Sequence, residues 1–249
     1  SGLRHVDEVL TYFGYKPGDR LGHGLVLQID IAEWVHNNEI VSLPVMEHLE
    51  NLLWLWSLCT KDLPQLSGEL PRLEREIMAL AEKIYGNTKG ITPYVLWKAY
   101  VRKFEQLDIP FCEDMEKRYL HEKDQYGRRS PQVQPDVQRS FCARVRQMDE
   151  TEELCSLPYV DAVWDSDKLL LTHYCPVYAR VYRSAYFTSN SAAQTSMFQL
   201  VQSHMKNKVQ NMGVFVETNP TSNMLIGDIS GLINYPIATL NGVGEQSTT

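Results

Sequence analysis

The stretch GDRLGHGLVLQID, residues 18–30, decides the expected fold. Its centre places His23 between Gly22 and Gly24, directly before an apolar run. Because glycine has no side chain, glycines on both sides of one histidine indicate either a sharp turn of the backbone or the close approach of a bulky group to the imidazole ring. The rest of the chain has to distinguish these two interpretations.

The residues before this stretch predict a helix that is followed by a short strand. Apolar side chains recur at helical spacing over residues 2–13, and Gly14, Pro17 and Gly18 then indicate a turn. A short strand is expected near residues 20–23, and a further helix is expected to start at Asp30. Residues 1–31 therefore predict one helix–strand segment of an α/β protein.

The tail of the chain repeats this pattern. Residues 196–213 have helical periodicity, and the apolar residues 214–217 (VFVE) predict a buried strand. The strand runs into the polar segment TNPTSN, residues 218–223, and another strand is expected near residues 237–240. Residues 193–249 therefore predict a second α/β segment.

Residues 32–192 are expected to form a large, mostly α-helical insertion between these two segments. Ser42 is a candidate N-cap, Gly86 a candidate C-cap, and Thr92 a candidate N-cap followed by a proline. Two further helices are expected near residues 150–165 and 176–187, and an exposed polar loop over residues 124–140.

Three tyrosines in the last of these helices are four residues apart: Tyr178, Tyr182 and Tyr186. This spacing predicts one half-buried helix face, with a ligand-stacking or subunit-contact surface as the alternative.

The composition restricts the class of protein. The net charge of −7 argues against the electrostatic capture of nucleic acid or of an anionic membrane. The five cysteines are widely spaced and form no CxxC motif, which favours reduced thiols in a cytoplasmic protein. The sequence contains no apolar run of the length that a membrane span needs, which is about 18 residues.

Two polar positions could carry chemistry. His23 is expected at the carboxyl end of a strand, where α/β barrels hold catalytic groups. Glu217 ends an apolar strand at a position expected to be buried, although a capped turn explains the same residues. The other histidines show no local metal-binding spacing, and His48, between Glu47 and Glu50, is expected on a solvated helix face.

Together, RLGHG at residues 20–24 and ETNPTSN at residues 217–223 resemble the adenosine and AMP deaminase family. In that family the sixth strand carries R-x-G-H-G and the seventh carries E-x-C/N-P-T-S-N. The resemblance covers the head and the tail of the chain, and the heavily inserted deaminases of bacterial antiphage defence systems are similar in having a large insertion.

The resemblance implies two adjacent strands of a zinc-dependent (β/α)8 barrel that hydrolyses the 6-amino group of adenine. His23 would orient the attacking water without binding zinc, while Gly22 and Gly24 would let the purine and the metal come close. Glu217 would be a buried acceptor that fixes ring orientations. The substrate-side loop would be shaped by Asn219, Thr221, Ser222 and Asn223.

The sequence also departs from the family. The H-x-H, H-A-G-E and D-D-P motifs, which bring the zinc ligands and the proton donor, are absent from these 249 residues. We therefore expect the chain to be a fragment of a longer enzyme, with zinc ligands outside it and with no deaminase activity of its own.

The expected function is that of a segment of a deaminase that acts on an adenine nucleoside or nucleotide. The alternative is a catalytically inactive barrel relative whose helical insertion is an oligomerisation or partner-docking module. In both cases a homo-oligomer formed through the insertion is expected. Arg128 and Arg129 could contact a substrate phosphate, or could be a solvated charge pair.

Overall fold

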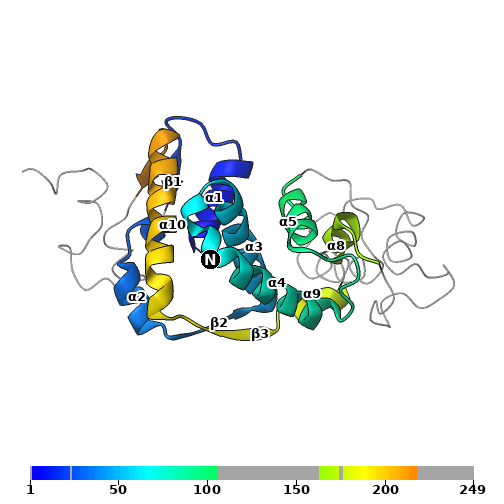
Figure 1. The fold of residues 1–249 in the computed structure, drawn as a ribbon. Helices are drawn as coiled ribbons and strands as arrows, with labels where there is room; N and C mark the ends of the chain where they lie inside the picture. The colour runs from blue at the N-terminus through cyan, green and yellow to red at the C-terminus, as the bar shows by residue number, and fades with distance from the viewer. Residues whose placement is uncertain (1, 23, 106–162, 174–175, 218–249) are drawn as a thin grey trace, which may run out of the picture. The chain divides into compact units, whose positions relative to one another are not determined.

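The computed structural model describes residues 2–22, 24–105, 163–173 and 176–217, and this part of the chain is mixed α/β, mostly helical with few strands (Figure 1). The chain divides into two compact units. Unit 1 comprises Ser1–Val41 and Phe187–Thr249, and unit 2 comprises Ser42–Tyr186. The described strands form two separate two-stranded sheets, β1–β4 and β2–β3.

Unit 1 brings together elements from both ends of the sequence. Its elements are α1 (Gly2–Tyr12), β1 (Arg20–Gly22), the 3-10 helix η1 (Gly24–Leu27), α2 (Ile31–Asn37), α10 (Ala192–Asn211) and β4 (Phe215–Glu217). Helix α10 packs against α1, α2 and η1. The most deeply buried side chains of this unit belong to Leu27, Val201 and Met205.

Local sequence explains the ends of several elements in unit 1. The Asp30 carboxylate accepts hydrogen bonds from the backbone N–H groups of Ala32 (2.8 Å) and Glu33 (3.0 Å), so the predicted helix start at Asp30 is confirmed. Gly213 has φ of 65°, a left-handed conformation that lets the chain reverse between α10 and β4.

Unit 2 is a helical assembly with a core of its own. It contains α3 (Val45–Lys61), η2 (Pro64–Glu69), α4 (Leu70–Tyr85), α5 (Pro93–Arg102), α8 (Ser166–Thr172) and α9 (Pro176–Tyr182). Helices α3 and α4 lie side by side. Apolar residues at helical spacing fill the space between the helices, and the fully buried ones include Leu49, Leu53, Leu73, Ile77 and Leu169.

Two of the caps predicted for unit 2 are confirmed. Gly86 follows α4 with φ of 70°, and the Thr92 hydroxyl accepts a hydrogen bond from the Val95 N–H at 3.2 Å. The predicted loop over residues 124–140 and the strand near residues 237–240 lie outside the described residues, as does most of the helix near 150–165.

A two-stranded ribbon that the sequence did not predict carries the chain from unit 1 into unit 2 and back. It consists of β2 (Ile40–Pro44) and β3 (Ala185–Ser189). The Asn190 N–H donates to the Glu39 carbonyl, and the Val45 N–H donates to the Ser184 carbonyl, each at 2.9 Å. The two strands are therefore antiparallel.

This ribbon overturns two predictions. Ser42 lies inside β2 and is not a helix cap, because α3 begins at Val45 after Pro44. The helix expected over residues 176–187 ends at Tyr182, and Tyr186 lies on β3. Tyr178 and Tyr182 remain on one helix and are buried, but the spacing of four residues could not reveal that a distant strand would pair with residues 185–189.

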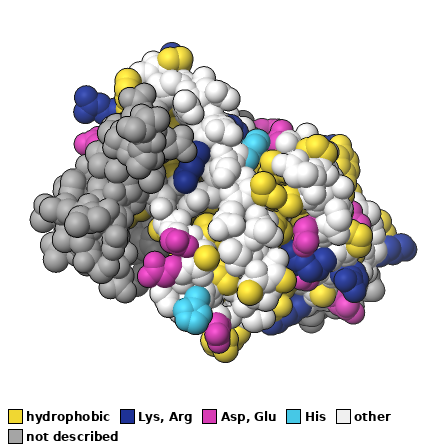
Figure 2. All heavy atoms as spheres, turned by 60° about the vertical axis from the view of Figure 1, so that its left-hand side comes forward, with side chains coloured by type: hydrophobic (Ala, Val, Ile, Leu, Met, Phe, Trp, Pro, Cys, Tyr) yellow, Lys and Arg dark blue, Asp and Glu magenta, His cyan; other side chains and the backbone are white. Residues whose placement is uncertain are grey.

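Exposed apolar side chains occur in both units. The most exposed are Ile40 (72 %) and Phe187 (68 %), and Phe13 and Phe215 follow. On the face drawn in Figure 2, apolar side chains lie among acidic and basic ones. Single exposed apolar groups are ordinary on protein surfaces and indicate no ligand by themselves.

Candidate functional site

The two peptides singled out in the sequence meet in unit 1 as neighbouring parallel strands. Strand β1 pairs with β4 in the register Arg20↔Phe215, Leu21↔Val216 and Gly22↔Glu217. The expectation that they lie side by side is therefore confirmed. Because the strands are parallel, their carboxyl ends lie at the same edge of the sheet, which is where α/β proteins bind ligands.

The two faces of the β1–β4 pair differ. Leu21 is buried and Val216 is half-buried, whereas their neighbours along each strand are exposed. The exposed face carries Arg20 and Gly22 from β1, with Phe215 and Glu217 from β4. At the carboxyl ends, this face presents a glycine next to a carboxylate.

Glu217 is exposed, so the prediction of a buried carboxylate is wrong for this structure. The prediction assumed that an apolar strand is covered on both faces. Among the described residues β4 has β1 as its partner strand, and the side chains that alternate with Val216 point away from the face that η1 covers.

The two glycines around position 23 serve different purposes. A Cβ atom on Gly24 would lie 2.6 Å from Cγ1 of Val216, so the absence of a side chain lets η1 pack directly onto β4. A Cβ atom on Gly22 would meet none of the described atoms within 4 Å. Packing therefore explains Gly24, which corrects the interpretation that Gly24 leaves room for a ligand. Packing by the described residues does not explain Gly22.

The remaining predicted site residues lie outside the described part of the chain. These are His23, Asn219, Thr221, Ser222 and Asn223. Arg128 and Arg129 lie outside it as well. The structure therefore brings together three of the predicted positions, namely Gly22, Gly24 and Glu217, in one sheet and the turn that follows β1.

Sequence reasoning missed Gln202, which contacts the segment that follows β1. It lies on α10 and is 6 % exposed. Its Nε2 group donates hydrogen bonds to the carbonyl oxygens of Val26 (3.1 Å) and Ile29 (3.0 Å), in the segment that follows Gly24. The sequence did contain one sign of this role: Gln202 is a polar residue next to the apolar stripe that includes Val201 and Met205. A polar side chain that is buried among apolar ones usually has hydrogen-bond partners.

Gln28, in the same segment, has a different environment. Both polar atoms of its side-chain amide are buried, and neither has a hydrogen-bond partner among the described residues. Leaving a buried amide without partners costs about 1–3 kcal/mol per group. Gln28 therefore weakens unit 1 while Gln202 stabilises it.

The residues that the structure describes do not fit a zinc site. Among them, no three His, Cys, Asp or Glu side chains lie close enough to hold a metal ion. Zinc in proteins needs three or four such ligands. The described residues alone therefore provide no metal chemistry for the β1–β4 edge.

Unit 2 holds a separate cluster of buried polar groups. The Tyr182 hydroxyl is hydrogen-bonded to the Thr172 hydroxyl and lies 3.3 Å from that of Tyr85. Burial raises the pKa of Tyr85 to about 12 and raises the pKa of Tyr182 well above its ordinary value. Both hydroxyls therefore stay protonated and act as hydrogen-bonding groups.

The ring centroids of His173 and Tyr182 lie 5.5 Å apart. Burial lowers the pKa of His173 to about 4, with a smaller opposing effect from Glu50 and a smaller lowering effect from Lys103. Glu50 and Lys103 form an ion pair of 2.7 Å. His173 is therefore neutral at pH 7, and its neutral form is the one that the folded chain favours.

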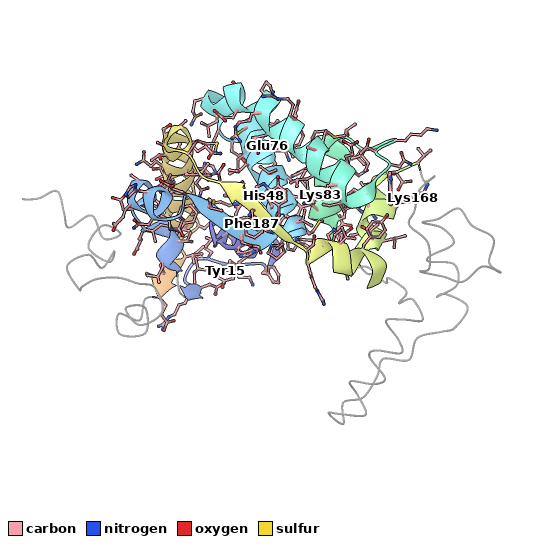
Figure 3. All side chains as sticks on the ribbon, turned by 90° about the horizontal axis from the view of Figure 1, so that it is seen from below. Tyr15, His48, Glu76, Lys83, Lys168 and Phe187 are labelled. Carbon is pink, nitrogen blue, oxygen red and sulfur yellow. The ribbon has the colours of Figure 1, made fainter. Side chains whose placement is uncertain are left out.

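His48 was expected on a solvated helix face, but its side chain is half-buried. Its ring stacks on that of Tyr186 with centroids 4.9 Å apart, and Lys83 Nζ lies 4.8 Å from the Tyr186 ring centroid. His48, Glu76 and Lys83 come from the neighbouring helices α3 and α4 (Figure 3). Burial lowers the pKa of His48, and the nearby Glu76 opposes this shift.

In the part of the chain with described coordinates, the helices lack the combined length and apolar character required to cross a bilayer. Comparison with known proteins finds no family model that matches the chain and no curated protein that matches it.

Proposed function

We propose that this chain contributes two adjacent strands to the (β/α)8 barrel of a zinc-dependent hydrolytic deaminase. The proposed substrate is an adenine nucleoside or nucleotide, and the proposed location is cytoplasmic. One observation carries the proposal: RLG and FVE pair in parallel and in register, with Gly22 beside Glu217. Gly22 and Glu217 are the last residues of the two strands, and the rest of the RLGHG and ETNPTSN motifs follows them in the sequence.

The exposure of one face of the β1–β4 pair favours the proposal that the two strands belong to a larger sheet. Parallel sheets in proteins are covered on both faces, and a two-stranded sheet by itself is marginal in water. On the face opposite η1, Phe215 is 66 % exposed. In a barrel this face would be covered by side chains from the other strands, while helices cover the outside.

The proposed reaction is the replacement of the 6-amino group of adenine by an oxo group. Water oxygen adds to C6 and the C6–N bond breaks. The amino group takes one proton of the water and leaves as ammonia, and the other proton remains on ring nitrogen N1. The resemblance assigns His23 to orienting the water, and no described atom lies within 4 Å of the position that a Cβ on Gly22 would take. Zinc ligands would have to come from outside the described residues.

The test is metal content and ammonia release in the full-length protein that contains this chain. A panel of adenosine, AMP, ATP and a polynucleotide adenine identifies the substrate. His23→Ala should abolish ammonia release, while the matched control His36→Ala, an exposed histidine on α2, should not. Ammonia release that survives His23→Ala would refute the proposed role. Stoichiometric zinc and deamination by the 249 residues alone would show that they are not a fragment.

As the second candidate function we propose that the insertion is an oligomerisation module. Unit 2 has a core of its own, so the insertion can be tested by removing it as a unit. The Val45 N–H bonds the Ser184 carbonyl at 2.9 Å, so a short turn can replace everything between these residues. Joining β2 to β3 through Asn-Gly, a sequence suited to two-residue hairpin turns, should convert an oligomer into a monomer in light scattering. An oligomer that persists would refute this role.

A further inference from the structure

We propose that Gln202 is a positioning residue for the edge of the sheet at which Gly22 and Glu217 meet. The effect of Gln202 on catalysis rests on the proposed function. The positioning does not, because both hydrogen bonds that Gln202 donates go to the segment that follows β1.

The two carbonyl groups that Gln202 binds lie on either side of Leu27 and Gln28. Leu27 is fully buried, and Gly24 packs onto Val216 of β4. One amide therefore fixes the path of residues 24–29 from α10, the helix that precedes β4. Through these contacts Gln202 sets how the end of β1 sits against the end of β4.

The position of Gln202 along α10 places it at the relevant end of the strands. Helix α10 ends at Asn211, and the chain reverses at Gly213 into β4. Gln202 precedes the helix end by about 13 Å, while β4 rises by about 7 Å from Phe215 to Glu217. Gln202 thus reaches the level of the carboxyl ends, where α/β proteins bind ligands.

Lys208 provides a matched control on the same helix. Its Nζ lies 2.6 Å from Asp7 Oδ1 and 2.8 Å from Thr11 Oγ1. These contacts join α10 to α1 closer to the amino ends of the strands. Lys208→Met therefore removes a polar contact between α10 and its surroundings without touching residues 24–29.

The experiment compares Gln202→Met and Lys208→Met in the 249-residue chain by two-dimensional NMR. We expect Gln202→Met to move the amide signals of Gly22 and Gly24 and the ring signals of His23, and Lys208→Met to leave them in place. Equal shifts in both variants, or no shift in Gln202→Met, would overturn the proposal.

Gln202→Glu makes the same hydrogen bonds dependent on pH. A carboxylate cannot donate to the two carbonyl groups, whereas the protonated acid can donate one bond. The Gly22 and Gly24 signals of this variant should therefore approach those of the wild type as the pH falls from 8 to 5. Signals that do not change with pH would count against the proposal.

In the full-length protein, Gln202→Met should lower kcat for the substrate by about 100-fold, because small displacements of reacting groups have effects of that order. KM should change little, and Lys208→Met should leave kcat in place. Unchanged kcat in Gln202→Met would refute the catalytic consequence. A wild-type protein without deaminase activity would refute the proposed function, while the NMR comparison would still decide whether Gln202 positions this segment.

Discussion

Gly22 lies opposite Glu217 in the parallel β1–β4 pair, and no atom of the described residues would lie within 4 Å of a Cβ on Gly22. Two residues further along the chain, the backbone of Gly24 is in contact distance of Val216, the neighbour of Glu217. Gly22 and Gly24 therefore have two different roles. Gly22 leaves this point of the sheet edge uncovered by the described residues, and Gly24 lets the following turn pack onto the partner strand.

This separation predicts different effects of the same substitution. Gly24→Ala should lower the free energy of unfolding by about 1–3 kcal/mol, because the new methyl group overlaps Cγ1 of Val216. Gly22→Ala should leave stability nearly unchanged, since its Cβ meets none of the described atoms. Urea unfolding of unit 1 measures both.

The double variant Gly24→Ala with Val216→Ala tests the cause. Removing Cγ1 leaves the Val216 Cβ at 3.7 Å from the new methyl group, an ordinary contact. The two substitutions together should therefore cost less than the sum of their separate effects. Additive costs would show that the loss in Gly24→Ala has another origin.

The two separate cores predict two independent sets of mutational effects. Met205 in unit 1 and Ile77 in unit 2 are fully buried. Replacement of either residue by alanine should cost about 2–5 kcal/mol. Met205→Ala should weaken hydrogen-exchange protection in unit 1, and Ile77→Ala should weaken it in unit 2. Loss of protection across both units from either variant would contradict their independence.

His173 predicts that unit 2 loses stability in acid. Burial lowers its pKa from 6.5 to about 4 in the folded chain. Between these values the unfolded chain binds a proton that the folded chain does not, so the free energy of unfolding falls as the pH drops from about 6.5 to about 4. The loss should reach about 3 kcal/mol and should not grow below pH 4.

The measurement is urea unfolding of unit 2 at several pH values between 7 and 4. His173→Gln should flatten the dependence on pH, because the group that binds the extra proton on unfolding is removed. His36→Gln, on the exposed surface of α2, is the control and should leave the profile as it is. A profile that His173→Gln does not change would assign the acid sensitivity to other groups.

Gln28 predicts a stabilising substitution. Its buried amide has no hydrogen-bond partner in the described part of the chain, so an apolar side chain of similar length should remove a desolvation cost. Gln28→Met should raise the free energy of unfolding by about 1–3 kcal/mol, while the exposed control Gln65→Met should have almost no effect. A loss of stability in Gln28→Met would instead show that the amide has a polar partner in solution.

Sequence reasoning succeeded where the cause of the structure is local. Asp30 and Thr92 cap helices because their side-chain oxygens bind backbone N–H groups two or three residues away. Gly86 ends α4 because a residue without Cβ adopts positive φ easily. The two short strands around RLG and FVE were expected, as was their adjacency.

The tertiary structure decided the features that depend on distant partners. The pairing of β2 with β3 placed Ser42 and Tyr186 in strands, although Ser42 was expected as a helix N-cap and the spacing of Tyr186 fits a helix. The packing of His48 on Tyr186, the exposure of Glu217 and the two bonds of Gln202 depend likewise on residues far away in the chain.

The amino-acid sequence by itself determined where several helices begin or end, and which two strands meet at one sheet edge. Only the folded chain decided which side chains at that edge are buried, why Gly24 and Gly22 differ, and which residue holds the turn after β1. The physical reason is that caps and periodicity act over a few residues, whereas burial and hydrogen-bond partnership are set by whatever the fold brings into contact.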